Sequence, residues 1–314
     1  MTHISILIPA HNASATIRET MDGCLHQGDS VGEIILVDDG SIDDTSTQAE
    51  AWASQHAIPV KIIRQQNRGA CHARNVAFQS AAHDWIQWLD CDDVLATGKL
   101  EQQLQRGLSH PRSLMYSGWR KFESSILETS FSEWDSLENG YTPEAWIESR
   151  TMGIPGCWLG HRSLFQEVGP WDERLSINQD GDYFTRAIVR ADTIQVVKGT
   201  GVHYRTGHAN RTSHFTPDKA LSLFRSVQSF EREIARLDAN LNQVVAEQYQ
   251  TFIHRVYPHC REQRKEALRK VQELAESPIP NHLLESRLSQ HIAKFIGWKA
   301  FVLLRQWSWK FRTP

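Results

Sequence analysis

The first hundred residues alternate between short runs rich in β-branched residues and stretches with helical periodicity, and this alternation constrains the fold more than any other feature. The expected strands lie at 4–9, 33–39, 60–65 and 84–90, and the expected helices between them at 14–26, 43–56 and 69–82. Short buried strands that alternate with helices form parallel sheets from right-handed βαβ units. This part of the chain is therefore predicted to be an α/β sheet.

Polar or turn-forming residues follow each expected strand, in the order PAHN, DDGS, QQNRG and DCDD. Ligands of open α/β sheets bind beyond the carboxyl ends of the strands, so a ligand site is expected at this edge. It is not an NAD site of the usual kind. The first strand-to-helix turn, PAHNASAT, contains none of the glycines that let a backbone approach a pyrophosphate.

The rest of the chain is less regular at first and then helical. Strands are expected at 114–119 and 193–199, and helices at 143–150 and 180–189. From Pro217 onward nearly all of the sequence has helical composition, with breaks near Pro258 and Pro278/Pro280. A segment rich in Gly, Asn, Ser and Pro lies at 207–217 and predicts a boundary. We therefore expect a first domain at 1–213 and a helical C-terminal region at 214–314.

The composition disfavours several classes of protein. A net charge of -3 gives no reason to expect nucleic-acid binding. Five scattered cysteines without a CxxC pair argue against a disulfide framework or a zinc site and favour a reducing compartment. The N-terminus lacks the pattern of a signal peptide, and no run reaches the ~18 apolar residues of a spanning helix. A cytoplasmic protein is expected.

The second expected strand ends in VDDGSIDDT. Gly40, Ser41 and Asp43 suit a tight turn and a helix cap, but two adjacent acids before the turn need another explanation. A carboxylate at Asp39 can accept an N–H from a base such as uracil. The next helix carries Arg74, and an arginine near a helix N-terminus gains nothing from the helix dipole. Arg74 fits either beside an anion, meaning a diphosphate or neighbouring aspartates, or in a simple pair with Asp39.

Three carboxylates crowd the end of the fourth expected strand, WLDCDD: Asp90, Asp92 and Asp93. Each like charge raises the cost of ionising the others. No basic residue is adjacent in sequence, so a divalent cation is the best stabiliser, and oxygen ligands favour Mg²⁺ or Mn²⁺. A helix cap at Asp92 or Asp93 is the alternative.

These segments resemble a known family. ILIPAHNA, EIILVDDGSIDDT, NRGACHARNVA and WLDCDDVL occur in the order and spacing of the family 2 inverting glycosyltransferases, which have a GT-A fold. The resemblance covers residues 4–95 and continues more loosely to about residue 213. It implies a Rossmann-like mixed sheet flanked by helices, with a helical C-terminal region outside the resemblance. It implies that the domain at 1–213 is a catalytic domain that depends on a nucleotide sugar.

The resemblance implies roles on the donor side of the site. The residues that would frame the nucleotide base or lie near it are Pro9, Ala10, Asp39 and Arg74. Asp90 and Asp92 match the family's DxD motif, with Asp90 near the ribose and Asp92 on the Mn²⁺ or Mg²⁺ ion that holds the diphosphate. Asp93 would serve the sugar or the fold.

On the acceptor side, the family carries an acidic pair, often Glu-Asp, whose aspartate is the catalytic base. The matching segment is NQDGDYFTRA, so Asp180 falls on the base and Gln179 replaces the glutamate. Asp182 is expected to be a cap or a hydrogen-bond acceptor, and Trp158 would line the sugar site. The segment HYRTGHANRTS resembles a mobile loop that closes over the diphosphate, with a solvated loop as the equal alternative. Its candidate residues are His203, Arg205 and His208.

The implied activity is a metal-dependent, inverting transfer of a sugar from a nucleotide-diphosphate sugar, first of all a UDP-sugar, to a hydroxyl. The expected acceptor is a saccharide or lipid-linked molecule of bacterial surface polysaccharide or glycolipid synthesis. A carboxylate base suits a hydroxyl that loses its proton on attack, and a metal and an arginine suit a leaving diphosphate. One alternative is a nucleotidyltransferase, whose glycine- and lysine-rich first turn is missing here. The other is a non-catalytic nucleotide-sugar-binding scaffold, which only Gln179 suggests.

The end of the chain has its own pattern, because no acidic residue follows Glu285. On a helical wheel Arg287, Lys294, Arg305 and Arg312 form one stripe opposite an apolar face, with tryptophans along an edge. Such a helix suits either the inner face of the cell membrane, as a peripheral contact, or protein, meaning the first domain or a second subunit in a homodimer.

Overall fold

The computed structural model describes residues 2–277 apart from 124, 125, 127–130, 132, 133, 135, 152 and 208–214. The chain divides into two compact units. Unit 1 comprises Met1–Arg174 and Gln179–Arg211, and unit 2 comprises Leu175–Asn178 and Thr212–Pro314. The short segment 175–178 therefore belongs to the second unit, which the sequence did not indicate.

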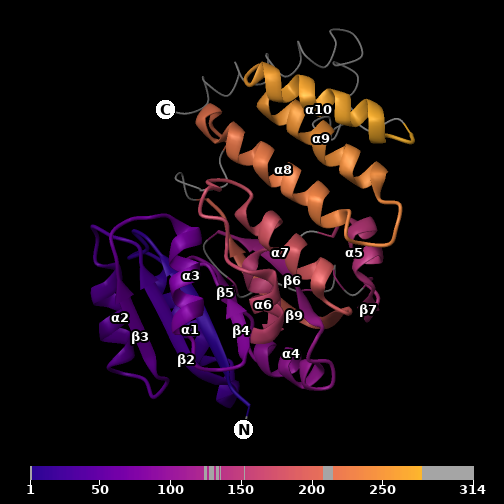
Figure 1. Ribbon diagram of the computed structural model, residues 1–314. Helices are drawn as coiled ribbons and strands as arrows, with labels where there is room; N and C mark the ends of the chain where they lie inside the picture. Colours follow the sequence, from indigo (N-terminus) through magenta and orange to yellow (C-terminus); the bar gives the residue numbers. More distant parts are fainter. Residues whose placement is uncertain are drawn as a thin grey trace. The chain divides into compact units, whose positions relative to one another are not determined.

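Unit 1 is built on one mixed sheet (Figure 1). Its strands are β1 (Ile4–Ala10), β2 (Val31–Asp38), β3 (Val60–Arg64), β4 (Trp85–Trp88), β5 (Val94–Leu95), β6 (Leu114–Phe122), β7 (Gly140–Tyr141), β8 (Trp158–His161) and β9 (Ile194–Arg205). The order across the sheet is β3-β2-β1-β4-β8-β6-β9-β5, and β7 pairs with β9. The first four strands pair in parallel, whereas β8 is antiparallel to both of its neighbours. The predicted mixed sheet is confirmed.

Helices flank this sheet. They are α1 (Ile17–Leu25), α2 (Thr45–Ala53), α3 (Ala70–Ser80), α4 (Lys99–Leu108), α5 (Pro143–Ser149), α6 (Arg162–Val168) and α7 (Gln179–Arg190). Helix α1 begins three residues later than the sequence predicts, because the residues before it contact a distant turn. The backbone N–H groups of Ala13 and Ser14 donate to the side chains of Thr45 (2.7 Å) and Asp43 (3.0 Å). The turn after β1 is thus tied to the turn after β2 before the helix starts.

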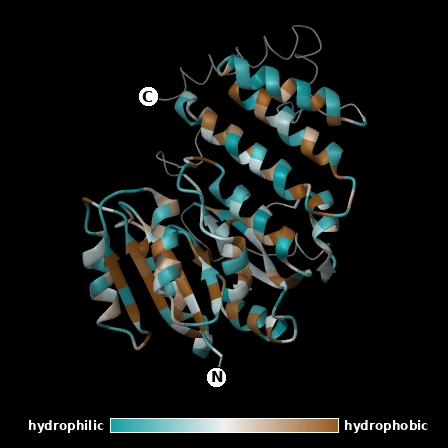
Figure 2. Cartoon of the chain, viewed as in Figure 1, coloured by the Kyte–Doolittle hydropathy of each residue, from teal (hydrophilic) through white to brown (hydrophobic). Residues whose placement is uncertain are grey.

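The core of unit 1 consists of continuous apolar strands, which Figure 2 shows as brown arrows. Every residue of β1 and of β4 is buried. Strands covered on both faces have no polar face to alternate with, and each fully buried aliphatic or aromatic side chain contributes roughly 1.5–3 kcal/mol. The polar side chains within these two strands, Ser5 and Gln87, are buried and form hydrogen bonds, whereas the charged residues follow the strand ends.

Unit 2 is helical in its described part, as predicted. Its helices are α8 (Ala220–Ile234), α9 (Asn242–Val256) and α10 (Arg261–Leu274). The ring of Phe224 on α8 lies 5.0 Å from that of Phe252 on α9. Glu231 accepts hydrogen bonds from the Tyr249 hydroxyl (2.6 Å) and from Lys270 Nζ (2.7 Å), which joins all three helices. The predicted break near Pro258 falls between α9 and α10 and is confirmed.

Three sequence-based expectations reach beyond the described residues. The predicted break at Pro278/Pro280, the basic C-terminal helix and His208 all lie outside them. Within the part of the chain that the structure describes, no helix is both long and apolar enough to cross a membrane.

Candidate active site

Asp39 directly follows β2 and is 3% exposed. Its carboxylate accepts hydrogen bonds from the backbone N–H groups of Arg68 (2.8 Å) and Gly69 (2.7 Å) and from Gln65 Nε2 (2.7 Å). Asp39 therefore holds the loop between β3 and α3. A carboxylate offers about four acceptor positions, so the predicted contact with a nucleotide base stays a prediction and would use the remaining capacity.

Gly40 permits this loop arrangement. Its φ of +75° is in the left-handed region, and a Cβ placed there would lie 2.8 Å from the backbone nitrogen of Asn67. Only glycine has both the conformational freedom and the space for this approach. The turns after β2 and β3 are thereby brought together at the carboxyl edge of the sheet.

His11 is a candidate that the sequence analysis missed. It follows Pro9 and Ala10, which are the buried last residues of β1, and its own side chain is exposed. His11 Nδ1 lies 2.9 Å from the carbonyl oxygen of Asp39, and Nε2 lies 3.2 Å from Asn67 Nδ2. The signal was available, because a polar aromatic ring directly after a central strand must project at the carboxyl edge.

The turn DCDD after β4 is held by hydrogen bonds from the α1 side and by one within the turn. The hydroxyls of Thr16 and Thr20 on the α1 side both donate to the carbonyl oxygen of Cys91, at 2.9 and 3.0 Å. The backbone N–H of Asp93 donates to the carbonyl oxygen of Asp90 at 3.2 Å. The direction in which these side chains leave the turn is therefore fixed by the fold.

Asp93 points inward and is completely buried. Its Oδ1 accepts the backbone N–H of Arg205 at 3.1 Å, whereas Oδ2 has no hydrogen-bond partner. Burial, and then the charges of Asp92 and Asp90, raise the pKa of Asp93 well above its usual range. Of the two roles that the resemblance allows for Asp93, this environment supports the role in the fold.

Arg205 and His203 lie on β9, and not on a loop as the sequence analysis expected. Arg205 is 8% exposed; its Nε donates to the carbonyl oxygen of Asp92 at 2.9 Å, and its guanidinium pairs with Glu19. His203 is 7% exposed, and burial lowers its pKa. The loop expectation is wrong for both, because β9 extends to Arg205 through parallel pairing with β6.

Arg74 joins two parts of the site. Its guanidinium is buried, pairs with Asp90 Oδ1 at 2.6 Å and donates to Gln179 Oε1 at 3.2 Å. The alternative pairing with Asp39 is therefore wrong, and the placement beside neighbouring aspartates is confirmed. The charge of Asp90 raises the pKa of Arg74 against the opposing effect of burial. The end of β4 and the start of α7 meet at this residue.

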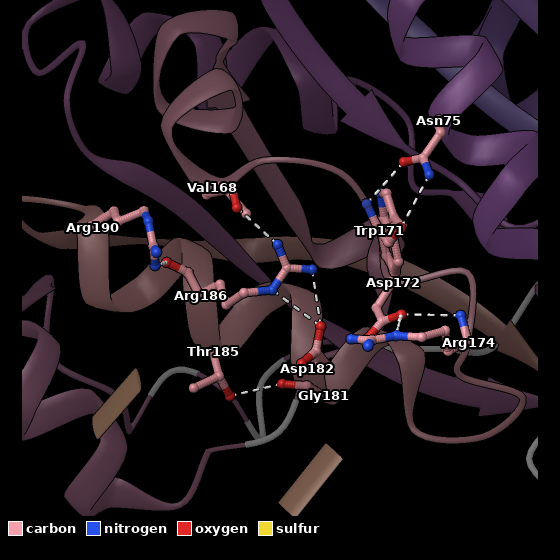
Figure 3. A network of polar contacts seen from close by, with 10 residues as sticks. All are labelled: Asn75, Val168, Trp171, Asp172, Arg174, Gly181, Asp182, Thr185, Arg186 and Arg190. Atoms are coloured by element: carbon pink, nitrogen blue, oxygen red, sulfur yellow. Dashed lines mark hydrogen bonds and ion pairs between the residues drawn. The ribbon is translucent and has the colours of Figure 1, made fainter. Parts of the chain in front are cut away.

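Asp180 is half-buried in the first turn of α7. Burial, and after it the charge of Asp90, raise the pKa of Asp180, whereas the Gly181 N–H and the charge of Arg74 lower it. Asp182 is buried and accepts from Arg186 Nη2 at 2.9 Å (Figure 3), so its predicted role as an acceptor is confirmed. Asp180 is thus the acid of α7 that shares its surroundings with Asp90 and Arg74.

Trp158 is 1% exposed and packs in an aromatic cluster. Its ring stacks on Phe184 at 5.3 Å and meets Tyr116 edge to face at 4.9 Å. Its indole N–H has no hydrogen-bond partner. The structure therefore gives Trp158 a core role, and its predicted place at the sugar site stays a prediction.

The residues at the end of β4 suit a hard cation. Asp90 and Asp92 provide only carboxylate oxygens, which Mg²⁺ and Mn²⁺ prefer. Among the described residues no group of three or more His, Cys, Asp or Glu side chains could hold a metal ion. A Mg²⁺ site that relies on one or two carboxylates and on substrate phosphates needs no such group, so this donor set fits the predicted ion.

The glycosyl transferase family 2 model matches residues 5–169, which is more than half of the 314 residues. The chain therefore belongs to glycosyl transferase family 2. The match includes Asp39, Arg74 and the DCDD turn, and it ends before α7, so Asp180 lies outside it.

Several curated relatives bear the same class of name. The uncharacterised glycosyltransferase EpsJ of Bacillus subtilis is 31% identical over 207 residues, which are 62% of this chain and 58% of EpsJ. An uncharacterised glycosyltransferase of Haemophilus influenzae is 24% identical over 272 residues, 82% of this chain and 84% of the relative. The chain spans 31% of the length of two Rickettsia relatives and 56% of a third.

Solved structures show the same fold. Residues 1–349 of Staphylococcus aureus TarS, in complex with UDP-GlcNAc, match with a TM-score of 0.69 at 18% identity, over 96% of this chain and 90% of that one. The mannosyltransferase PcManGT of Pyrobaculum calidifontis, in complex with GDP-Man and Mn²⁺, matches with a TM-score of 0.59 at 14% identity, over 96% and 86%. The predicted GT-A fold is confirmed.

Proposed function

We propose that this protein is an inverting glycosyltransferase that moves a sugar from a nucleotide-diphosphate sugar to a hydroxyl acceptor. The observation that carries the proposal is the position of Arg74, which pairs with Asp90 at the end of β4 and donates to Gln179 at the start of α7. The carboxylates suited to the donor and the carboxylate suited to proton removal thus share one site.

The donor side of the proposed site is the edge formed by β1, β2 and β4. The nucleotide base would lie beside the end of β1, at Pro9, Ala10 and His11. The carboxylate of Asp39, whose backbone contacts His11, would accept a hydrogen bond from the base. Asp90 and Asp92 would hold a divalent cation, Mn²⁺ or Mg²⁺, which when bound neutralises charge on the diphosphate. Arg74 adds a fixed positive charge to the same region. This set suits a nucleoside diphosphate as the leaving group.

Asp180 is the proposed base. A hydroxyl that attacks the anomeric carbon must lose its proton, and a carboxylate on its far side can accept it. Burial and the charge of Asp90 raise the pKa of Asp180, which makes its carboxylate a stronger proton acceptor than an exposed aspartate. One in-line displacement inverts the anomeric centre. No covalent intermediate on the protein is required.

A UDP-sugar is the first donor to test, because TarS was solved with UDP-GlcNAc. GDP-mannose, which was bound to PcManGT with Mn²⁺, is the second. We propose a saccharide or lipid-linked acceptor of bacterial surface polysaccharide or glycolipid synthesis. Peripheral contact of the C-terminal segment with a membrane, or with a second subunit, also stays a proposal.

The test is a donor panel with Mn²⁺ that measures the nucleoside diphosphate released with and without candidate acceptor saccharides. A true donor present at about 100 times its dissociation constant should also stabilise the protein by roughly 2.7 kcal/mol. Transfer by the wild type and its loss in Asp180→Asn support the proposal. Donor binding without release in either protein would instead favour the non-catalytic scaffold. The nucleotidyltransferase alternative gains no support from the family match.

A further inference from the structure

Helix α3 and the residue before its N-cap hold the loop that precedes α7. Arg68, His72 and Asn75 have the spacing of one helix face, and all three contact Glu173. His72 Nδ1 lies 3.0 Å and Asn75 Nδ2 3.1 Å from Glu173 Oε1, and Arg68 lies 3.7 Å from its Oε2. These contacts hold the pKa of Glu173 below its ordinary value. The loop is therefore fastened to α3 over about two turns.

Asn75 makes the most specific of these contacts. Its Oδ1 accepts the backbone N–H of Trp171 at 2.8 Å, and its Nδ2 donates to the carbonyl oxygen of the same residue at 3.0 Å (Figure 3). A side-chain amide that pairs with both backbone groups of one residue fixes its orientation as well as its position. In this protein that residue lies 96 positions further along the chain.

The ring of Trp171, whose backbone Asn75 holds, contacts Arg74. The Arg74 guanidinium lies 4.5 Å from the centroid of the Trp171 ring. Tyr183 of α7 stacks on Trp171 with the ring centroids 4.0 Å apart. Cation–π attraction between an arginine and an aromatic face is stronger when the pair is desolvated, and both Arg74 and Trp171 are buried. The indole N–H has no hydrogen-bond partner, so the aromatic face carries the interaction.

We propose that Asn75 is a positioning residue for the transfer reaction: it clamps the backbone of Trp171, whose ring holds Arg74 in place to join Asp90 to Gln179. The inference rests on the proposed function of Asp90 and Asp180. Without the contact between Asn75 and Trp171, we expect Arg74 to lose its hydrogen bond to Gln179 before it loses its ion pair with Asp90. The Arg74–Asp90 contact is an ion pair at 2.6 Å, whereas the Arg74–Gln179 contact is a longer bond to a neutral amide at 3.2 Å.

The expected effect is therefore on the chemical step more than on donor binding. Loss of the clamp frees the start of α7, which carries Asp180, while Asp90 keeps its arginine. A misplacement of about 1 Å in a reacting group can cost a hundredfold in rate. We expect Asn75→Ala and Trp171→Leu each to lower kcat about ten- to hundredfold, and UDP affinity in the presence of Mn²⁺ to stay at the wild-type value.

Two matched variants separate positioning from general stability. Trp171→Phe keeps an aromatic face over Arg74. Because the Trp171 indole N–H makes no hydrogen bond, this change removes none, and kcat should remain near the wild-type value. Arg174→Gln changes an exposed side chain of the same loop, which contacts Asp172, and should leave kcat unchanged. Asn75→Asp keeps the acceptor for the Trp171 N–H but places a carboxylate oxygen against the Trp171 carbonyl and Glu173, so it should lower kcat at least as far as Asn75→Ala.

The experiment measures kcat and KM with the donor found in the panel, UDP affinity by calorimetry, and backbone amide exchange of peptides that span 169–185. Faster exchange at Trp171 and at 179–181 in Asn75→Ala, with kcat reduced and UDP affinity kept, supports the clamp. Unchanged exchange at 179–181, or equal losses in Trp171→Phe and Trp171→Leu, overturns it. If the wild type transfers no sugar, the proposed function fails, and exchange at 179–181 alone still decides whether Asn75 holds the start of α7.

Discussion

A buried lysine behind the DCDD turn provides a quantitative test of the structure. Lys99, the first residue of α4, is fully buried, and its Nζ donates to Gln87 Oε1 at 2.8 Å and to Gln103 Oε1 at 2.6 Å. Gln87 lies on β4, so this network supports the strand that carries the DCDD turn. Burial lowers the pKa of Lys99 to about 7.

This shift has a definite sign. In the unfolded chain a lysine has a pKa of about 10.4, so between about pH 7 and pH 10.4 the unfolded state binds a proton that the folded state does not. The free energy of unfolding must rise with pH in this window. Each pH unit is worth about 1.4 kcal/mol, so Lys99 should add about 2–3 kcal/mol between pH 7 and pH 9. That contribution is lost as the pH falls toward the folded pKa of about 7.

The assay compares the wild type with Lys99→Met by urea unfolding at pH 7, 8 and 9, followed by tryptophan fluorescence. The variant leaves two amide oxygens unpaired, which costs roughly 1–3 kcal/mol each, but this cost does not depend on pH. The difference in unfolding free energy, wild type minus variant, should therefore rise by about 2–3 kcal/mol across the range. Lys61→Met, at an exposed position of β3, serves as the control. A flat difference for Lys99→Met would refute the reasoning, because the lysine would then be charged in the folded protein.

Four further predictions concern the proposed site and its surroundings. UDP affinity measured by calorimetry should fall when EDTA replaces Mn²⁺ and when Asp92 is changed to Ala; equal affinity in all three cases would contradict the metal assignment. Asp180→Asn should keep UDP affinity and lose transfer by roughly 10²–10⁴-fold, and normal turnover would place the base elsewhere. Activity needs the ionised form of Asp180, whose pKa is raised, so activity should fall as the pH drops through that pKa. Arg74→Gln removes a positive charge that lowers the pKa of Asp180. The acid limb of the pH–rate profile should therefore move to higher pH in this variant. The chain of 314 residues should sediment with anionic liposomes more than a chain that ends at Asn281, and if it ignores anionic vesicles at low salt, the C-terminal basic stripe has no membrane role.

The sequence could predict whatever depends on local pattern. The alternation of strands and helices in the first hundred residues, and the polar residues that follow each strand, are properties of short segments with fixed periodicity. Because parallel strands share one carboxyl edge, the gathering of Asp39 and Asp90 near that edge followed without any knowledge of distant contacts. The pairing of Arg74 with one acid or another was open, since helix geometry gives its direction but not the position of the neighbouring strand end.

Contacts between remote segments could not be predicted in this way. Arg205 follows a Tyr and precedes a segment with Gly, Asn, Ser and Pro, which locally resembles a loop. In the structure β6 pairs with residues up to Arg205 and extends the strand. The clamp between Asn75 and Trp171 joins residues whose separation carries no periodic signal. The inward orientation of Asp93 also could not be predicted, because Asp92 and Asp93 are adjacent and of the same residue type. It depends on the backbone N–H of Arg205, which donates to the Asp93 carboxylate.

Gln179 stands where the family often has a glutamate, and the structure gives this difference a physical explanation. The sequence alone allowed the replaced glutamate to suggest a non-catalytic scaffold. In the structure Arg74 is buried between Asp90 and Gln179 with Asp180 nearby, and a buried charge is tolerated only when it is paired. One arginine beside two acids leaves a net charge of minus one, and a glutamate at 179 would make it minus two without adding a second cation. A neutral amide keeps the hydrogen bond to Arg74 and leaves the arginine to Asp90. Gln179 is therefore compatible with a site in which Asp180 remains an available base, and it gives no separate reason to prefer the scaffold.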